Sequence, residues 1–539
     1  MNGELGGLIM TGMDGGSEGQ AAEAAQVEEV GPAPIQPSWL WQPDLIVFIS
    51  SGCIMILELV AGRIVAPYVG VSLYTWTSVI GVVLAGITLG NYLGGWLADR
   101  YASLRLLGGL LLLAGLTSFG ILAVEGLGGG LPGTWPVVVE ILVLTAALFL
   151  LPCLILGTLS PIVAKLAVRD LRRTGRTVGR IYAAGSVGSI VGTFATGFVL
   201  ISWFGTYTIV WGVAVVLMAM GLLFILSRRW PLLVVGLLLL TGTSVLAETQ
   251  DWLRGPCSLE TNYYCIKVKE QERNGELVRV LVLDRLVHSY SSLEDPTRLV
   301  YGYEQIYAEA TAYRAATDGH LKALFIGGGG YTFPRYMEAV YPGSELDVIE
   351  IDPGVTEVAH QVLGLSRDTS IVTFNQDARL YLEQEAKERY DLIMADAFND
   401  YSVPYHLTTR EFNERVRAWL ADDGLYMVNM IDGPRGDFLR ACIHTLGQTF
   451  DHVYLVPAIE SWREASRSTF VLIATDTPPD LALLFKQDGG DGHSLLAERI
   501  LYPDQVAALL AEGEAVTLTD RYAPVDQMLA PVFRHEATR

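Results

Sequence analysis

The segment Leu321–Asp352, LKALFIGGGGYTFPRYMEAVYPGSELDVIEID, decides the fold of the C-terminal half of this chain. An apolar run ends at four glycines, a stretch with helical patterning follows, and a second apolar run ends in two acids. This order is typical of Rossmann-type nucleotide sites, where glycines admit the ligand and an acid about 20 residues later binds ribose hydroxyls. We therefore expect a nucleoside-type ligand at Gly327, Gly328 and Gly329, with Glu350 accepting from the ribose. The alternatives are an ordinary tight turn and an exposed acid at a strand end.

Strand and helix patterns alternate through most of the remaining chain. This alternation favours a doubly wound, mostly parallel sheet that binds ligands at the carboxyl ends of its strands. Upstream, two alternating runs at 261–270 and 277–284 flank Asn274-Gly275, which favours a β-hairpin. We predict a small β-hairpin domain at 256–310 and an α/β Rossmann-like domain of the methyltransferase type, with a C-terminal tail, at 311–539. The strands of the larger domain are expected near 321–326, 345–351, 370–374, 389–396, 424–430, 451–456 and 468–475.

The chain before residue 250 is dominated by apolar stretches. The whole sequence is 51% hydrophobic, and the apolar excess is concentrated in this half. Because a helix needs roughly 20 residues to cross a hydrocarbon core about 30 Å thick, most of these stretches are long enough to span a bilayer. We predict a multi-pass α-helical membrane domain at 41–248, with the lipid bilayer as a partner, after a disordered tail at 1–40 that lacks the features of a signal peptide. The seven predicted spans lie at about 42–66, 73–98, 105–125, 136–166, 180–203, 206–227 and 231–247.

Several residues within these spans carry structural or functional predictions. Pro152 and Pro161 predict a kink in the fourth span. Glu58 is ionisable within the first span, and Arg63 follows five residues later. Glu58 either escorts a cationic substrate or belongs to a structural ion pair or polar clamp between helices. Close helix packing is predicted at the glycines of positions 81, 86, 90, 94 and 95.

Charge and cysteine content limit the classes of ligand. The net charge of −21 disfavours nucleic acid as a partner and suits cationic small molecules. No cysteine or histidine spacing indicates a metal site or a redox pair, so no metal is expected. Cys257 and Cys265 either form a disulfide in an oxidising compartment or stay as two thiols.

Acidic residues follow the third and fourth predicted strands of the larger domain. Asp377-Ala378 follows the third strand, Asp396 ends the fourth, and Asp400 stands in the next loop. Two carboxylates at the mouth of such a sheet suit a basic substrate, because they bind an ammonium group and accept its proton. The alternative is that each aspartate only caps a helix or stabilises a turn.

The order of these motifs resembles the polyamine aminopropyltransferases, the spermidine synthases. The resemblance covers residues 258–475 and rests on GGGG, VIEID, QDA, YDLIMAD and HLTTREF. ELVAGRIVAPYVG, YTWTSVIG and GGWLADR in the helical half, and LTDRYAPVDQM near the C-terminus, are similar to membrane-fused members of that family. The resemblance implies an enzyme that moves an aminopropyl group from decarboxylated S-adenosylmethionine, a co-substrate, to putrescine or a related amine. It implies no permanently bound cofactor and, by analogy with family members that pair through their hairpin domains, a homodimer.

On the nucleoside side, the resemblance implies roles for seven residues. The range Gly327–Gly329 would pass beneath the nucleoside, and Glu350 would hold the ribose. Asp377 and Ala378 would contact the adenine edge, and Pro404 would lie in a flap over the adenosyl group.

On the amine side, the resemblance implies that Asp396 is the general base that deprotonates the attacking amine. Asp400 would help to seat that amine, and Tyr301 or Tyr303 would line its tunnel. His288 stands where the family has a nucleoside-binding glutamine.

Two departures from the family pattern fall on the amine side. Gly330 replaces the aspartate of the family's GGGDG loop, and the acidic signature from Asp396 to Asp400 is one residue longer than the family's. Asp520 or Asp526 of the tail motif is the candidate replacement for the missing acid. Two other functions therefore stay open: a methyltransferase-like enzyme using S-adenosylmethionine, and a polyamine transporter or sensor with a non-catalytic nucleoside-binding domain.

The orientation in a cell membrane is predicted from the basic residues. These follow the second, fourth and sixth spans, so the even-numbered ends are expected to face the cytoplasm. Seven spans would then place the C-terminal domain outside, whereas adenosyl metabolites are cytoplasmic. The sequence leaves the side of this domain open.

Overall fold

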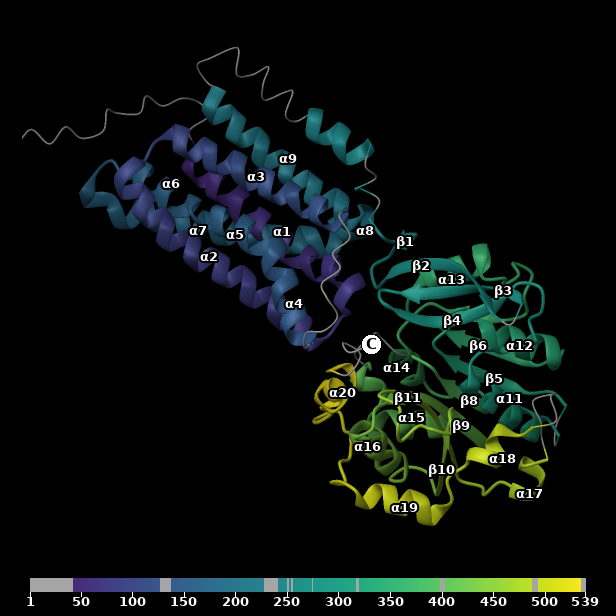
Figure 1. Cartoon of the computed structure of the whole chain (residues 1–539). Coiled ribbons are helices and arrows are strands. Elements are labelled where there is room, and N and C mark those ends of the chain that lie inside the picture. The colour runs from purple at the N-terminus through teal and green to yellow at the C-terminus, as the bar shows by residue number, and fades with distance from the viewer. Residues whose placement is uncertain are drawn as a thin grey trace, which may run out of the picture. The chain divides into compact units, whose positions relative to one another are not determined.

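The computed structural model describes a helical half followed by an α/β half (Figure 1). The predicted tail at 1–40, most of the seventh predicted span and the predicted site residue Asp400 lie outside the described residues. The described residues are 42–126, 137–226, 241–249, 252–253, 255–273, 275–316, 319–397, 403–486 and 493–534.

Among the described residues of the first half, six helical stretches are long and apolar enough to cross a membrane, and they coincide with the first six predicted spans. Of the seventh predicted span, only residues that belong to a helix at 241–249 are described. The fourth stretch is interrupted by a π-helical turn before Pro152 and by a break at Thr158, in agreement with the predicted kink. The helices are α1 Pro43–Val69, α2 Leu73–Tyr101, α3 Leu104–Gly126, α4 Val137–Thr145, α5 Leu151–Gly157, α6 Leu159–Ala167, α7 Thr174–Ala195, α8 Ile201–Trp203 and α9 Thr206–Leu226.

Glycines of α2 allow close packing on α5 and α6, as predicted for three of the five positions. A Cβ atom added at Gly86, Gly90 or Gly94 would lie less than 3.0 Å from atoms of Cys153, Leu154 or Thr158 respectively. At positions 81 and 95, by contrast, an added Cβ would meet no atom within 4 Å. The packing prediction was therefore wrong for these two positions, because a helical repeat of glycines places only some of them on the contact face.

The α/β half begins with an antiparallel sheet of four strands in the order β1-β2-β3-β4. β2 and β3 pair as far as Arg273 and Glu276, so the turn falls where the hairpin was predicted. A disulfide joins Cys257 to Cys265, which decides between the two alternatives that the sequence left open. The strands are β1 Leu259–Glu260, β2 Cys265–Arg273, β3 Glu276–Leu283 and β4 Leu286–Ser292.

A sheet of seven strands follows, in the order β10-β11-β9-β8-β5-β6-β7. β9, β8, β5, β6 and β7 run parallel, whereas β11 and β10 are antiparallel additions. The strand order reverses at β5, and in such sheets ligands bind outside the carboxyl ends at this switch point. The strands are β5 Lys322–Ile326, β6 Glu345–Ile349, β7 Val372–Phe374, β8 Tyr390–Ala395, β9 Leu420–Asp432, β10 His452–Pro457 and β11 Ser468–Thr475.

Side chains of the central strand alternate between two hydrophobic cores, one on each face of the sheet. Ala323 and Phe325 pack in the core that α11, α12 and α13 cover, and Leu324 and Ile326 pack in the core that α14, α15, α16 and α20 cover. Each large apolar side chain that is fully buried contributes about 1.5–3 kcal/mol. The helices are α11 Gly302–Ala315, α12 Thr332–Val340, α13 Pro353–Val362, α14 Ala378–Leu382, α15 Arg410–Trp419, α16 Asp437–Leu446, α17 Leu481–Leu484, α18 Leu495–Arg499, α19 Pro503–Ala511 and α20 Val525–Arg534.

Candidate active site

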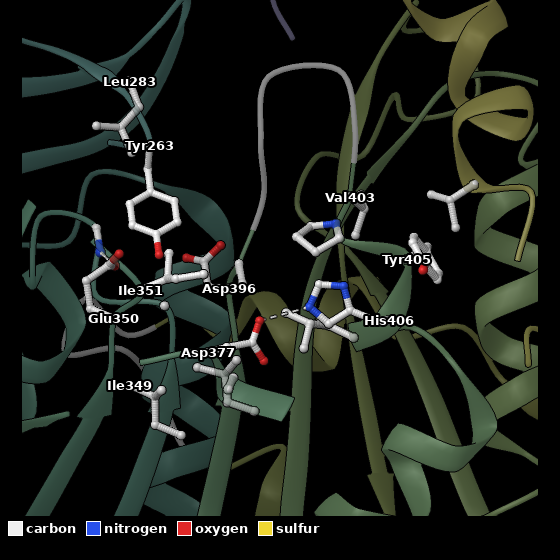
Figure 2. A pocket seen from close by; sticks show the side chains of 18 of the residues that line it. Tyr263, Leu283, Ile349, Glu350, Ile351, Asp377, Asp396, Val403, Tyr405 and His406 are labelled. Carbon is white, nitrogen blue, oxygen red and sulfur yellow. Dashed lines mark hydrogen bonds and ion pairs between the residues drawn. The ribbon is translucent and has the colours of Figure 1, made fainter. Parts of the chain in front are cut away.

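A cavity of about 540 Å³ opens at the carboxyl ends of β5, β6 and β8, where the sheet topology favours a ligand (Figure 2). The four-stranded sheet and the C-terminal tail also contribute to its wall. Most of the predicted nucleoside-side residues line it, namely Gly327, Gly329, Glu350, Asp377, Ala378, Pro404 and His288.

The glycine turn after β5 fixes the position of Glu350. The amide groups of Gly328 and Gly329 donate to Oε2 of this carboxylate at 2.8 and 3.3 Å, and Asp352 N donates to Oε1 at 2.9 Å. Gly327 has a φ of +99°, and a Cβ there would collide with the Asp396 carbonyl oxygen. Burial raises the pKa of Glu350, and the three amide groups oppose that rise. The acid is therefore held rigidly, with acceptor capacity left for a ligand hydroxyl.

Asp377 lines the cavity and also caps a helix. Its Oδ1 accepts from the amides of Arg379 and Leu380 at the start of α14, which is the capping role considered as an alternative. Its Oδ2 lies 3.2 Å from Nε2 of His406, and the two side chains point toward each other in Figure 2. His406 was not predicted, because nothing in the sequence links a histidine 29 residues downstream to this aspartate.

Asp396 is half-buried at the end of β8, and both of its carboxylate oxygens accept hydrogen bonds. Tyr303 of α11 donates its hydroxyl to Oδ2 at 2.8 Å, and Asn429 of β9 donates Nδ2 to Oδ1 at 2.7 Å. Burial raises the pKa of Asp396, and the two hydrogen bonds oppose that rise. A carboxylate with a raised pKa that faces a cavity is a suitable proton acceptor.

The two tyrosines that the sequence proposed for the amine tunnel have different positions. Tyr303 contacts Asp396, whereas Tyr301 donates its hydroxyl to the Val287 carbonyl oxygen at 3.2 Å and lines neither cavity beside Asp396. The role proposed for Tyr301 in the amine tunnel therefore stays a prediction. Tyr301 precedes α11 as its N-cap, and its ring lies beside that of Tyr303, with centroids 5.4 Å apart.

A second, smaller cavity of about 50 Å³ adjoins Asp396 on the side of β4 and α11. His288 and Ser289 line it, and neither Nε2 of the histidine nor Oγ of the serine has a hydrogen-bond partner among the described residues. Burial, aided by the charge of Arg467, lowers the pKa of His288 to about 4, so the ring is neutral at pH 7. Glu304 lines the same cavity, and burial raises its pKa to about 8. This end of the site holds neutral polar groups next to Asp396.

Gly330 has a steric reason to be glycine in this chain. A Cβ built there would overlap Oγ of Ser289 and approach Oγ of Ser291 to 3.0 Å. The two serines of β4 therefore occupy the space that a larger side chain would need. Restoring an aspartate at position 330 would require β4 to move.

The C-terminal tail places one of its two candidate acids in the site. Asp526, in the first turn of α20, lines the larger cavity, is partly buried and has no hydrogen-bond partner among the described residues. Asp520 instead binds Arg379 and the Thr409 hydroxyl and is absent from the cavity wall. The structure therefore rules against Asp520 as the replacement acid.

Comparison with known proteins finds similar aminopropyltransferases. A polyamine aminopropyltransferase of Vibrio vulnificus is 34% identical over 110 residues, which make up 20% of this chain and 37% of that protein. Polyamine aminopropyltransferase 2 of Streptomyces coelicolor is 28% identical over 410 residues, covering 71% of this chain and 72% of that protein. This chain is similar to polyamine aminopropyltransferases. The resemblance predicted from the motifs is confirmed, and the second alignment is long enough to include part of the helical half.

Other comparisons are weaker. A crystal structure of a probable spermidine synthase from Corynebacterium glutamicum aligns with a TM-score of 0.42 and 21% identity, over 49% of this chain and 95% of that chain. The mouse eEF1A lysine and N-terminal methyltransferase is 29% identical over 120 residues, covering 21% of this chain and 17% of that protein. No protein-family model matches the chain.

Proposed function

We propose that this chain is a membrane-bound aminopropyltransferase that transfers an aminopropyl group from decarboxylated S-adenosylmethionine to putrescine or a related amine. The observation that carries the proposal is the half-buried Asp396 carboxylate, which Tyr303 and Asn429 hold beside the glycine turn. A base in this position adjoins both the nucleoside region and the smaller cavity behind it.

The nucleoside would lie over the range Gly327–Gly329. Glu350 would accept from the ribose hydroxyls, because the amide groups fix its carboxylate at the end of β6. Asp377 and Ala378 would flank the adenine, with His406 as an additional contact on Asp377. Pro404 would cover the adenosyl group from the opposite wall.

The proposed reaction is a displacement at carbon. The lone pair of a neutral amine nitrogen forms a bond to the aminopropyl carbon next to the sulfonium, and the carbon–sulfur bond breaks. The sulfur keeps the electron pair, so methylthioadenosine leaves as a neutral thioether. The proton that the nitrogen loses passes to Asp396, whose raised pKa favours its acceptance. Positioning and electrostatics supply the rate enhancement.

Acidic groups on two sides support a cationic amine substrate. Asp396 separates the two cavities, and Asp526 faces the larger one from the tail. The second amino group of the amine would interact with Asp526 or with the neutral acceptors His288 and Glu304 in the smaller cavity. Asp526 is the acid that we propose in place of the family's loop aspartate.

The six apolar helices support attachment to a lipid bilayer. The basic residues, taken with seven spans, favour an outward-facing α/β half, and the Cys257–Cys265 disulfide favours an oxidising compartment. The proposed co-substrate favours the cytoplasm instead. Protease added inside or outside sealed vesicles shows which compartment the α/β half faces. Pairing of two copies through the hairpin sheet stays a prediction.

Methyl transfer from S-adenosylmethionine is the second candidate function. The space near Gly330 is filled by Ser289, which removes one acid from the amine side, and the mouse methyltransferase match covers part of the chain. A non-catalytic transporter or sensor is the third candidate, and the proposed base Asp396 argues against it.

Product identification separates these functions. Detergent-purified protein is incubated with decarboxylated S-adenosylmethionine or S-adenosylmethionine and a panel of diamines, and the products are identified by mass spectrometry. Methylthioadenosine with a lengthened amine supports aminopropyl transfer. S-adenosylhomocysteine instead would support the methyltransferase, and turnover of neither compound would leave the sensor.

A further inference from the structure

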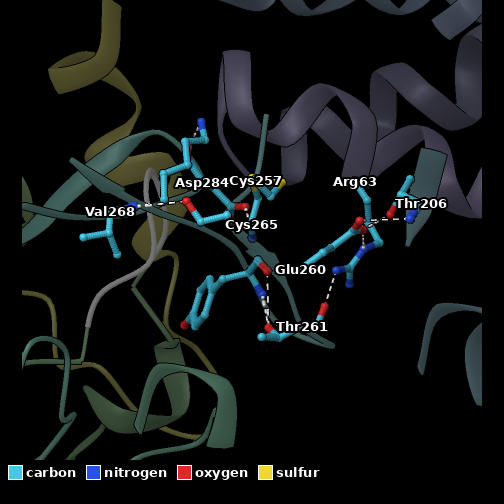
Figure 3. Close-up of a disulfide and its surroundings, with 11 residues drawn as sticks. Arg63, Thr206, Cys257, Glu260, Thr261, Cys265, Val268 and Asp284 are labelled. Atoms are coloured by element: carbon cyan, nitrogen blue, oxygen red, sulfur yellow. Dashed lines mark hydrogen bonds and ion pairs between the residues drawn. A yellow bond between two sulfur atoms is a disulfide. The ribbon is translucent and has the colours of Figure 1, made fainter. Parts of the chain in front are cut away.

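The loop between β1 and β2 is bound by a residue of the first helix of the chain (Figure 3). Arg63 of α1 donates Nε to Oε1 of Glu260 at 3.2 Å and Nη1 to the Asn262 carbonyl oxygen at 2.9 Å, and Nη2 donates to the Thr261 carbonyl oxygen. Glu260 also accepts from the amide of Thr206 at the start of α9, at 2.9 Å. The Arg63 and Glu260 side chains are only 18% and 19% exposed, so the pair is shielded from water and salt.

The same loop contacts the nucleoside region on its other side. The Thr261 hydroxyl donates to Oδ2 of Asp352 at 2.5 Å, and Asp352 N donates to Oε1 of Glu350 at 2.9 Å. Two residues, Thr261 and Asp352, therefore connect the Arg63 guanidinium to the acid at the end of β6.

Tyr263 gives the loop a direct role in the wall of the site. Its side chain lines the 540 Å³ cavity and also a neighbouring cavity of about 160 Å³ that Arg63 and Glu260 line. In Figure 2 the Tyr263 ring extends into the site beside Glu350. A shift of the loop would therefore move both the ring and the hydrogen-bond partner of Asp352.

We propose that Arg63 is a positioning residue for nucleoside binding: its guanidinium fixes the 260–264 loop, which in turn orients Tyr263 and the Asp352–Glu350 pair. This inference rests on the proposed function, because it assumes that the ligand at Glu350 is a nucleoside. It assigns the helical half a part in shaping the site. Arg63 pairs with Glu260 and not with Glu58, so these two residues of α1 have separate surroundings.

Equilibrium binding of methylthioadenosine to the detergent-purified full chain tests this role. Arg63→Gln should raise Kd for methylthioadenosine about tenfold, a typical size for a change within a coupling network. Arg63→Lys should recover part of the affinity, because lysine keeps the charge but lacks the planar fork of donors. Arg180→Gln is the matched control: Arg180 forms an exposed ion pair with Asp44 in the helical half, and its loss should leave Kd unchanged.

Steady-state kinetics separate positioning from general damage. In Arg63→Gln, KM for the nucleoside co-substrate should rise while KM for the amine and kcat at saturation change little. Thr261→Val removes the hydrogen bond to Asp352 without changing α1, and it should weaken binding of methylthioadenosine. In the double variant it should add little to the rise in Kd that Arg63→Gln causes. Thr261→Val also serves if Arg63→Gln does not fold.

If Arg63→Gln folds and its Kd is unchanged, the positioning role is overturned while the proposed function stays in place. If Arg63→Gln does not fold, an unchanged Kd in Thr261→Val has the same meaning. Equal rises in KM for the amine and the nucleoside would also overturn the positioning role. Failure of the unmodified protein to bind methylthioadenosine would overturn the proposed function, and this inference with it.

Discussion

The Tyr303 hydroxyl group donates a hydrogen bond of 2.8 Å to Oδ2 of Asp396, so a residue of α11 fixes the carboxylate at the end of β8. Asn429 fixes the other oxygen from the neighbouring strand β9. The carboxylate therefore has one orientation, and its pKa reflects opposing effects of burial and of hydrogen bonding. The first two predictions follow from this arrangement.

Asp396→Asn should lower kcat about 10²–10⁴-fold, the usual contribution of a general base, because the amide accepts no proton from the amine. The affinity for methylthioadenosine, measured by calorimetry, should change little, since the nucleoside contacts are made by other residues. Asp368→Asn, an exposed aspartate before β7, is the control. Retained turnover in Asp396→Asn would remove Asp396 as the base.

Tyr303→Phe should move the acidic limb of the kcat/KM profile toward higher pH by about one unit. The hydroxyl group stabilises the ionised form of Asp396, so its loss raises the pKa of that carboxyl further and leaves less base at a given pH. Tyr301→Phe is the matched control, because the Tyr301 hydroxyl donates to the Val287 carbonyl oxygen. Identical pH profiles for the Tyr303 variant and the unmodified protein would contradict the role of this hydrogen bond.

Glu304→Gln should flatten the dependence of thermal stability on pH. The native pKa of Glu304 is raised to about 8 from 4.5, chiefly by burial, so the native state keeps a proton that the unfolded state has released. The stability that the retained proton contributes is fully present below about pH 4.5 and is lost as pH rises through about 8. Tm of the unmodified protein should therefore fall more between pH 5.5 and pH 8.5 than Tm of the variant. Glu414 is exposed, so Tm of Glu414→Gln should change with pH as Tm of the unmodified protein does. If Tm of Glu304→Gln fell with pH as steeply as in these two proteins, Glu304 would not hold a proton in the native state.

Asp526→Asn should raise KM for the amine about tenfold, equivalent to about 1.4 kcal/mol, and leave KM for the nucleoside co-substrate unchanged. The reason is that Asp526 faces the cavity with no hydrogen-bond partner among the described residues, so its charge is available to an ammonium group. Asp504→Asn, an exposed aspartate at the start of α19, provides the comparison. An unaltered amine dependence would remove Asp526 from the substrate site.

The sequence predicted the sheet, and it predicted that the glycine turn, Glu350 and Asp377 lie around one cavity, because those features depend on local patterns. The glycine turn, Glu350 and Asp377 each stand directly after a strand, and parallel strands bring their carboxyl ends together. Once the strands were recognised, the proximity of these residues followed.

Residues that depend on contacts between distant segments were not predicted. Asn429 reaches Asp396 across neighbouring strands, His406 reaches Asp377 after an intervening loop, and Tyr263 enters the site from the four-stranded sheet. The choice between Tyr301 and Tyr303 depended on where α11 begins, since one residue precedes the helix and the other lies within its first turn. Helix ends are the least certain part of a sequence-based prediction.

The transfer itself is measured most directly with decarboxylated S-adenosylmethionine that carries deuterium in its aminopropyl group. Purified full-length protein is incubated with this compound and unlabelled putrescine, and both products are quantified by mass spectrometry. We expect one labelled aminopropyl group on the amine for each methylthioadenosine formed, with the signal lost in Asp396→Asn. An unlabelled amine after complete incubation, or methylthioadenosine without a lengthened amine, would contradict this expectation.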